Sequence, residues 1–422
     1  MTDTPTLLAG PEDDDPFEAF NRAMGAGGDA SPYASFAEAR ARGPIDGGGG
    51  GFVEEVADDE GGVQLGAPGA GALPMLVTAY SYDAVHEVLC GEAFSSAGYS
   101  EIMGAVFGRS ILEMDEPEHH TYRAVLQKAF TRKAMERWET ELVGPLVHGL
   151  IDEFIDDGRA DLVRQLLFPF PVNVIAALLG LPSEDLPAFH RLTVGMIGVS
   201  IDWDRAVQCS AALRNYLAGI LAVRRALPAD DMLSILATAE HEGQRLTDED
   251  IYAFLRLLLP AGAETTYRSS SNLLCGLLTH TDQLDALRSD RDLMPQAIEE
   301  GLRWEPPLLM ILRTASRDTE VCGVAIPAGT AIIVNLGSAN HDETRWERSD
   351  DLDIGRARLP HIAFAHGAHR CLGMHLARME TAVALNALFD RLPGLRLDPD
   401  APDPYISGMT FRAPPRLDVV WD

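Results

Sequence analysis

One cysteine lies in a turn bracketed by glycines, where its sulfur could bind a metal. Residues 364–373 read Phe-Ala-His-Gly-Ala-His-Arg-Cys-Leu-Gly, so the cysteine is Cys371. Apolar residues recur at near-helical spacing after it, which predicts a helix N-terminus at or near the sulfur. Free N–H groups and the helix dipole favour a thiolate there, the form that binds iron. Gly367 and Gly373 allow the close approaches that a loop against a flat cofactor needs.

An acid and an alcohol, Glu264 and Thr265, are adjacent in an apolar stretch. Pro260 removes a backbone donor and Gly262 removes side-chain bulk, so we expect a kink or a local opening in a helix. The Thr265 hydroxyl can bond back to the carbonyl of Ala261 and widen this groove. The groove could hold dioxygen, with Thr265 donating a hydrogen bond and Glu264 relaying protons from solvent. The alternative is a polar patch that bends the helix and has no catalytic role.

Four basic side chains form a second group of candidates. His119 and Arg123 are four residues apart at the start of a predicted helix, so they share one face. Arg313 follows an apolar run, and His369 lies two residues before Cys371. Each of them alone would more often be a solvated charge.

The pattern around the cysteine, FxxGxHxCxG, is complete and resembles the haem-binding signature of the cytochrome P-450 family of haem-thiolate monooxygenases. The resemblance covers roughly residues 73–422. It implies haem b (iron protoporphyrin IX) with Cys371 as the axial ligand of the iron. It also implies haem contacts, in the loop and at positions that hold the propionates in relatives, from Phe364, Gly367, His369, His119, Arg123 and Arg313.

The same resemblance implies that Glu264 and Thr265 are the acid–alcohol pair of the family. It implies further that Glu300 and Arg303, which share a helix face, form a buried ion pair beneath the haem-binding loop. The chain departs from the family where a second arginine usually joins that pair, because Asp351 stands there. The residues that could replace this arginine, among which the sequence does not choose, are Arg345, Arg348, Arg356 and Arg358.

The implied activity inserts one oxygen atom from O2 into a hydrophobic small molecule, by hydroxylation or epoxidation. No flavin- or nicotinamide-binding fingerprint follows a predicted strand, so we expect electrons from a separate ferredoxin or flavodoxin with its reductase. Basic residues near the cysteine side of the haem would suit an acidic donor, and these are Lys128, Arg132, Lys133, Arg137, Arg370 and Arg378. Three alternatives are a peroxide-driven peroxygenase, a non-catalytic haem-binding sensor, and a cysteine-nucleophile hydrolase with His369 as its base.

The substrate pocket should be apolar. Relatives place their pocket walls at positions that match Phe107, Ile111, Ala261, Leu308, Met310, Ile311, Met409 and Phe411. Apolar residues at such spacing are more often plain core. The stretch 97–114 carries more apolar side chains than an exposed loop should, so we expect a loop that lines a pocket or packs on itself.

Composition and length limit the remaining possibilities. The 422 residues carry a net charge of −30, which argues against nucleic acid or an anionic membrane surface as a partner. No apolar run reaches the roughly eighteen residues of a membrane helix, and no secretory signal is visible, so we expect a cytoplasmic protein. The five cysteines never form CxxC, which argues against disulfides or a zinc site.

Hydrophobic periodicity predicts a mainly α fold with a minor β-sheet. The resemblance implies a single large domain like that of cytochrome P-450. We expect a loosely ordered N-terminal segment over 1–70, with a short helix at 31–42, and the monooxygenase domain over 71–422. Strands are expected at 73–80, 321–326 and 331–336 and a helix from 82. Helices should dominate 115–250, and the longest helix should run from 247 to about 280.

Overall fold

The computed structural model describes residues 31–47, 75–197 and 202–422. Helices make up most of it and the strands are short, which confirms the predicted fold class. The α-helices are α2 (Tyr33–Arg42), α4 (Tyr82–Cys90), α5 (Tyr99–Phe107), α6 (Glu118–Leu126), α7 (Arg132–Trp138), α8 (Gly144–Asp152), α9 (Pro169–Leu178), α10 (Leu186–Ile197), α11 (Trp203–Ala226), α12 (Met232–Thr238), α13 (Asp248–Leu259), α14 (Thr265–Thr279), α15 (Thr281–Ser289), α16 (Met294–Trp304), α17 (Leu336–Asn340) and α18 (Met374–Arg391). Shorter π and 3-10 segments are η1 (Ile111–Glu113), η2 (Gln127–Ala129), η3 (Glu139–Val143), η4 (Ile155–Asp157), η5 (Val163–Leu167), η6 (Ser183–Asp185), η8 (Pro260–Glu264) and η9 (Arg291–Leu293).

The strands form one larger sheet and several small ones. The five-stranded sheet has the order β1-β2-β10-β7-β3, and β10 pairs parallel with β2 and antiparallel with β7. All five residues of β10 are buried, as expected for a central strand. The strands are β1 (Ile45–Asp46), β2 (Leu76–Ala79), β3 (Phe94–Ser95), β4 (Arg159–Asp161), β5 (Glu240–His241), β6 (Gln244–Arg245), β7 (Met310–Ala315), β8 (Thr319–Val321), β9 (Val324–Ile326), β10 (Ala331–Asn335), β11 (Arg396–Leu397) and β12 (Asp418–Val420).

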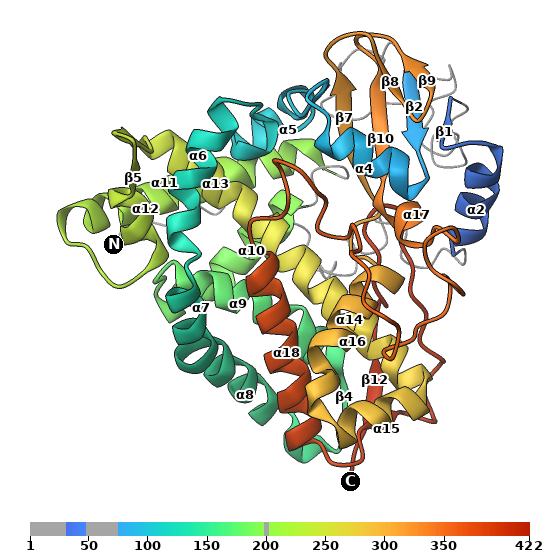
Figure 1. Cartoon of the computed structure of the whole chain (residues 1–422). Helices are drawn as coiled ribbons and strands as arrows, with labels where there is room; N and C mark the ends of the chain where they lie inside the picture. The colour runs from blue at the N-terminus through green and yellow to red at the C-terminus, as the bar shows by residue number, and fades with distance from the viewer. Residues whose placement is uncertain (1–30, 48–74, 198–201) are drawn as a thin grey trace.

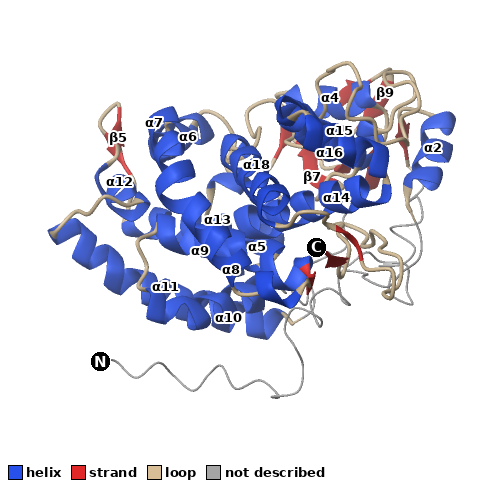
Figure 2. Cartoon of the chain, turned by 90° about the horizontal axis from the view of Figure 1, so that it is seen from below, coloured by secondary structure: helices blue, strands red, loops and turns tan. Residues whose placement is uncertain are grey.

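The larger sheet and most of the helices occupy different parts of the molecule. Figures 1 and 2 both place β7 and β9 near α2 and α4, away from α11 and α12. One hydrophobic core lies among the helices and a smaller one lies around the sheet and α4. The helices α14 and α18 pack against each other and belong to the larger core.

The central helical run extends over 248–279 as α13, η8 and α14, which confirms the predicted long helix. Thr247 caps its start: the hydroxyl accepts from the N–H of Asp250, and the Asp250 carboxylate accepts from the N–H of Thr247. Nearly every residue of α14 is buried. This helix is therefore held by packing on both sides and can carry a site in its middle.

Two local predictions were wrong. The strand expected at 321–326 is a hairpin, β8–β9, because Cys322 (φ 48°) and Gly323 (φ 82°) form a two-residue turn that reverses the chain. The loop expected at 97–114 contains α5 and η1. Gly104 lowers helix propensity there by about 1 kcal/mol relative to Ala, but Val106 and Phe107 are buried in the larger core and offset that cost.

Part of the segment expected to be loosely ordered is folded. The helix predicted at 31–42 is confirmed by α2, and β1 adds a strand to the sheet. The Tyr33 hydroxyl donates to Glu305 at 2.6 Å, and its ring stacks on His341. Arg40 donates to the carbonyl oxygens of Ser338 and His341. The rest of the predicted N-terminal segment lies outside the described residues.

Within the described residues, α11 is long and apolar enough to cross a membrane, judged by length and composition only. In this fold it packs along α10, α12 and α13. One face buries Cys209, Leu213, Leu217 and Leu221. Most of its other side chains are half-buried or exposed, so α11 lies along the edge of the larger core.

Candidate functional site

The cysteine loop, residues 364–373, leads directly into α18. The N–H of Cys371 donates to the carbonyl of Phe364 at 2.9 Å, and the N–H of Arg370 donates to Gly367 at 3.1 Å. Gly373 is the N-cap of α18, which begins at Met374. The cysteine therefore lies two residues before the N-cap, as its sequence spacing predicts.

Gly367 lets the loop pack against the end of α4. Its φ is 70°, and a Cβ placed on it would lie 2.2 Å from the carbonyl oxygen of Leu89. Only glycine satisfies both conditions without a shift of backbone. The close approach in the structure is thus to the backbone of α4. A Cβ at Gly373, by contrast, would have nothing within 4 Å among the described residues.

Two opposing effects act on the thiol of Cys371. Burial raises its pKa, whereas the N–H of Gly373 and the guanidinium of Arg123 act to lower it. The predicted helix-terminus effect is therefore present but is outweighed by desolvation. A bound cation would reverse the balance, because coordination deprotonates a thiol.

The four basic side chains converge on this loop from three segments. The rings of His119 on α6 and His369 in the loop are 4.1 Å apart. Arg123 donates to the carbonyl of Arg370 at 2.6 Å, and the buried Arg313 of β7 contributes to the low pKa of His369. Sequence positions up to 250 residues apart thus supply one cluster beside the cysteine.

Burial disfavours the charged form of both histidines. Burial and the neighbouring His119 and Arg313 lower the pKa of His369 to about 3. Burial also lowers the pKa of His119, whose Nδ1 lies 3.1 Å from Glu116. Its Nε2 is buried and has no hydrogen-bond partner among the described residues. The cluster therefore combines two guanidinium charges with neutral imidazoles that can donate hydrogen bonds.

This donor set fits a haem. A half-buried thiol supplies a soft ligand for iron, and two arginines with an unpaired imidazole nitrogen suit the anionic propionates. Phe364 and Gly367 hold the loop against α14, α16 and α4, and their carbonyls accept the hydrogen bonds within the loop. The residues present are thus compatible with the group that the sequence pattern implies.

The acid–alcohol segment forms a π-helical turn, η8, as the expected local opening of the long helix. The Thr265 hydroxyl donates to the carbonyl of Ala261 at 2.6 Å, as predicted. Ala261 is exposed and Thr265 is half-buried. The widened turn therefore leaves accessible surface in the middle of a helix that is otherwise buried.

Glu264 points into an ion pair on its own helix. Arg268, four residues on, donates from Nε to the Glu264 carboxylate. Both side chains are almost wholly buried, and the guanidinium lies 4.9 Å from the ring of Tyr267 and 5.7 Å from that of Phe411. Burial raises the pKa of Glu264 although Arg268 opposes the shift. In this structure the carboxylate is closed off from solvent.

The ion pair beneath the loop is buried and bidentate. Arg303 donates to both carboxylate oxygens of Glu300, at 2.7 and 2.8 Å. The structure also supplies the missing arginine: Arg356 donates from Nε to Glu300 at 3.0 Å. Arg348 instead pairs with Asp351 and Asp353 at the surface. Arg345 lies over the ring of Tyr82.

The predicted pocket residues lie in two environments. Phe107 is buried in the main core. The other seven are half-buried or, for Ala261, exposed. Leu308 and Phe411 face each other in an antiparallel bridge, and Met310 and Ile311 lie on β7. These side chains leave apolar surface available near the π-helical turn and β7.

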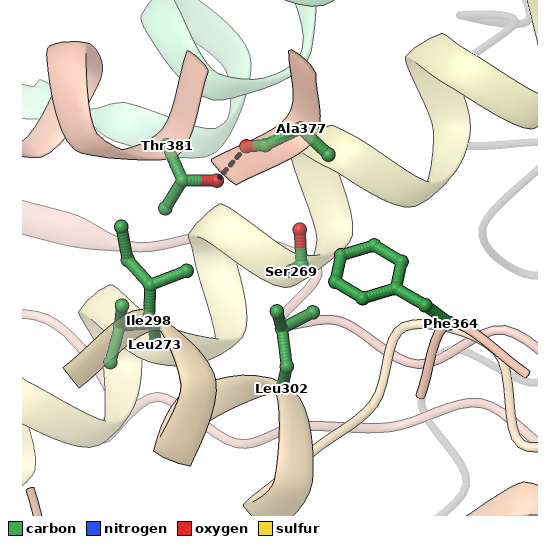
Figure 3. Close-up of a pocket in the computed structure, with 7 residues that line it drawn as sticks. All are labelled: Ser269, Leu273, Ile298, Leu302, Phe364, Ala377 and Thr381. Atoms are coloured by element: carbon green, nitrogen blue, oxygen red, sulfur yellow. Dashed lines mark hydrogen bonds between the residues drawn. The ribbon is translucent and has the colours of Figure 1, made fainter. Parts of the chain in front are cut away.

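A small cavity lies behind the cysteine loop. Figure 3 shows Phe364 facing Ser269 of α14 across it, with Thr381 of α18 donating to the carbonyl of Ala377. Its volume of about 10 Å³ is the size of one water molecule. The remaining lining residues are Leu273, Ile298 and Leu302. This cavity is too small for a substrate or a haem.

Three of the six basic residues expected to attract an electron donor are in ion pairs. Arg132 pairs with Glu136, Arg137 with Asp230, and Arg378 with Glu299. Lys128 donates to the carbonyl of Glu240. Lys128, Lys133 and Arg370 are the exposed cations of this group for which the described residues show no ion pair.

Sequence reasoning missed one buried acid, Glu380. It lies on α18, is 2% exposed, and forms a side-chain hydrogen bond with Thr266 of α14. Burial raises its pKa to about 8. Its spacing of four residues from Leu376 and from Ala384, both buried, was the available signal that it lies on the inner face of the helix.

Comparisons with known proteins agree with this geometry. The family model described as Cytochrome P450 matches residues 201–393. The cytochrome P450 monooxygenase PikC of Streptomyces venezuelae is 33% identical over 399 residues, 90% of each chain. A steroid C26-monooxygenase of Mycolicibacterium smegmatis is 37% identical over 317 residues, 74% of this chain and 79% of the relative. The crystal structure of CYP109E1 from Bacillus megaterium in complex with testosterone has a TM-score of 0.80 at 30% identity, covering 93% of this chain and all of that one.

Proposed function

Because the chain belongs to the cytochrome P450 family and is a monooxygenase of that type, we propose that it hydroxylates or epoxidises a hydrophobic small molecule. The cofactor would be haem b, and the Cys371 sulfur would bind its iron. The observation that carries the proposal is the convergence of the Cys371 thiol with Arg123, Arg313, His119 and His369 at the N-terminus of α18.

In this proposal, residues of the chain hold the haem at its iron and at its propionate groups. The Cys371 sulfur binds the iron, and the two guanidinium groups with His119 and His369 bind the propionates. When bound, the haem supplies oxygen activation, in which a thiolate ligand favours O–O cleavage. The Glu300 carboxylate holds the guanidinium groups of Arg303 and Arg356. These two groups donate to the backbone carbonyls at 340, 349 and 351, in the segment that leads into the loop.

The π-helical turn provides the oxygen site. The Thr265 hydroxyl, held against the Ala261 carbonyl, donates or orders a proton next to dioxygen. Glu264 exchanges protons with solvent after its ion pair with Arg268 opens, since the carboxylate is buried while that pair is closed. Removal of either group should therefore impair proton delivery more than substrate binding.

The substrate is apolar because the half-buried side chains around the turn and β7 are apolar. Relatives with steroid names or a bound testosterone support this class. Electrons come from a separate ferredoxin or flavodoxin with its reductase, and Lys133 and Arg370 are the cations available to meet an acidic donor. The protein is cytoplasmic and does not bind nucleic acid or a membrane.

The absorption spectrum of the purified, haem-loaded protein tests the proposal. After reduction and exposure to carbon monoxide, a strongly red-shifted Soret band is expected, and Cys371→Ala should abolish it while the control Cys322→Ser retains it. A Soret band like that of a histidine-ligated protein would contradict the assignment of Cys371. Product formation from a steroid with a ferredoxin and its reductase, compared with peroxide alone, separates a monooxygenase from a peroxygenase.

A further inference from the structure

Three potential metal ligands meet on the surface formed by α4 and the cysteine loop. His86 and Cys90 are four residues apart on α4 and so share one face. His366 belongs to the cysteine loop. One ligand atom of each lies within 4.8 Å of the others, and the Cys90 sulfur is 3.7 Å from Nε2 of His86. None of these three side chains has a part in the proposed reaction.

We propose that His86, Cys90 and His366 form a binding site for a transition-metal ion, with Zn²⁺ as the best fit. Two imidazoles and a thiolate are ligands that Zn²⁺ prefers. Bond lengths of about 2.3 Å to sulfur and about 2.0 Å to nitrogen place tetrahedral ligand atoms roughly 3.5 Å apart. Small rotations of the three side chains would bring their ligand atoms from the observed separations to this distance. The fourth position is left for water.

The surrounding packing holds the three ligand side chains close to one another. The ring of His86 is stacked near that of Tyr82 at an interplanar angle of 15°, and it lies 4.6 Å from the ring of His366. The contact between Gly367 and the Leu89 carbonyl fixes the loop on the end of α4. Cys90 is exposed, so an ion can reach the site from solvent. Binding would release the thiol proton.

His366 is far from the other two ligands along the chain. This explains why the spacing of the cysteines in the sequence argued against a zinc site. No CxxC pair is present, and His366 is 276 residues after Cys90. Only the fold brings them together. A bound ion would join the end of α4 to the loop five residues before Cys371, so it would tie down the segment that carries the proposed iron ligand.

Zinc binding to the reduced, haem-loaded protein tests the site. Equilibrium dialysis with Zn²⁺ should show one ion per chain, and zinc-edge X-ray absorption should show one sulfur and two nitrogen ligands. His86→Ala and Cys90→Ser should each weaken binding by more than about tenfold, since even changes beyond the direct ligands cost about that much. Cys322→Ser, which removes the other exposed cysteine, should bind Zn²⁺ like the wild type.

Equal binding by all variants, or a zinc shell without sulfur, would overturn the proposal. Zn²⁺ should also raise the Tm of the wild type and of Cys322→Ser, but not of Cys90→Ser, because it binds only the folded arrangement. These readouts do not involve turnover. A failure of the proposed oxygenase activity would therefore leave the metal result unaffected.

Discussion

Arg356 donates to the same carboxylate oxygen of Glu300 that accepts from Arg303, although it lies 56 residues beyond that glutamate in the sequence. It also donates to the carbonyls of Glu347, Arg348 and Asp351. One guanidinium thus ties the buried ion pair to the backbone of the following loop.

Arg356→Ala should lower the free energy of unfolding by about 1–3 kcal/mol, because it removes a charge-assisted hydrogen bond to the buried Glu300 carboxylate. The Arg356→Ala variant should also retain less haem than the wild type. The control Arg348→Ala removes only exposed pairs and should cost less than about 1 kcal/mol. Urea unfolding of both variants measures the difference, and equal effects would show that Arg356 is not the third member of the cluster.

Gly367→Ala should displace the cysteine loop. The new Cβ meets the Leu89 carbonyl at 2.2 Å, and the backbone is also in the left-handed region. Gly329 has a similar φ of 82° but nothing within 4 Å of its Cβ position among the described residues. Gly329→Ala should therefore cost only about 1 kcal/mol, whereas Gly367→Ala should cost clearly more and slow haem incorporation. Thermal unfolding and haem titration of the two variants check this, and a similar loss in both would assign the effect to φ alone.

Thr265→Ala should divert reducing equivalents to hydrogen peroxide, since it removes the hydroxyl proposed to order protons beside dioxygen. Substrate affinity should change little. Thr279→Ala serves as the control, because its hydroxyl makes the same kind of bond to a carbonyl four residues earlier at the far end of α14. The ratio of product formed to electrons consumed is the measurement. A ratio unchanged by Thr265→Ala would contradict the role.

Glu380 should make stability depend on pH. Its folded pKa of about 8 lies above the ordinary value of 4.5, so between these values unfolding releases a proton. Stability must then fall as pH rises through this window, by up to about 1.4 kcal/mol per pH unit for a single proton. Glu380→Gln should remove this slope, and the exposed Glu153→Gln should not. Denaturant unfolding between pH 5 and pH 8 compares them, and parallel curves for wild type and Glu380→Gln would refute the prediction.

Features set by neighbouring residues were predictable from the sequence. The cap at Thr247, the opening at Pro260 and the bond from Thr265 to Ala261 each depend on residues within one helical turn. The cysteine loop ahead of a helix is similarly local. Short-range sterics and hydrogen bonding determine such features before any tertiary contact is made.

Features set by tertiary contacts were not predictable from the sequence. The identity of Arg356 depends on the path of a loop, which follows no sequence period. The neutrality of His119 and His369 depends on burial beside other positive groups. The meeting of His86 and Cys90 with His366 needs α4 to pack on the cysteine loop. Glu380 is an intermediate case, because helical spacing indicated its burial but not its partner.

The helix α2 supplies one side of a buried charged cluster. Glu305 is held by Arg412 on one side and by the Tyr33 hydroxyl on the other, all three buried. A chain shortened to start after Asp46 would open this charged pair to water and leave β2 as an unprotected sheet edge, a template for aggregation. A chain that keeps residues 33–46 should therefore be more stable and less prone to aggregation than one that begins at residue 71.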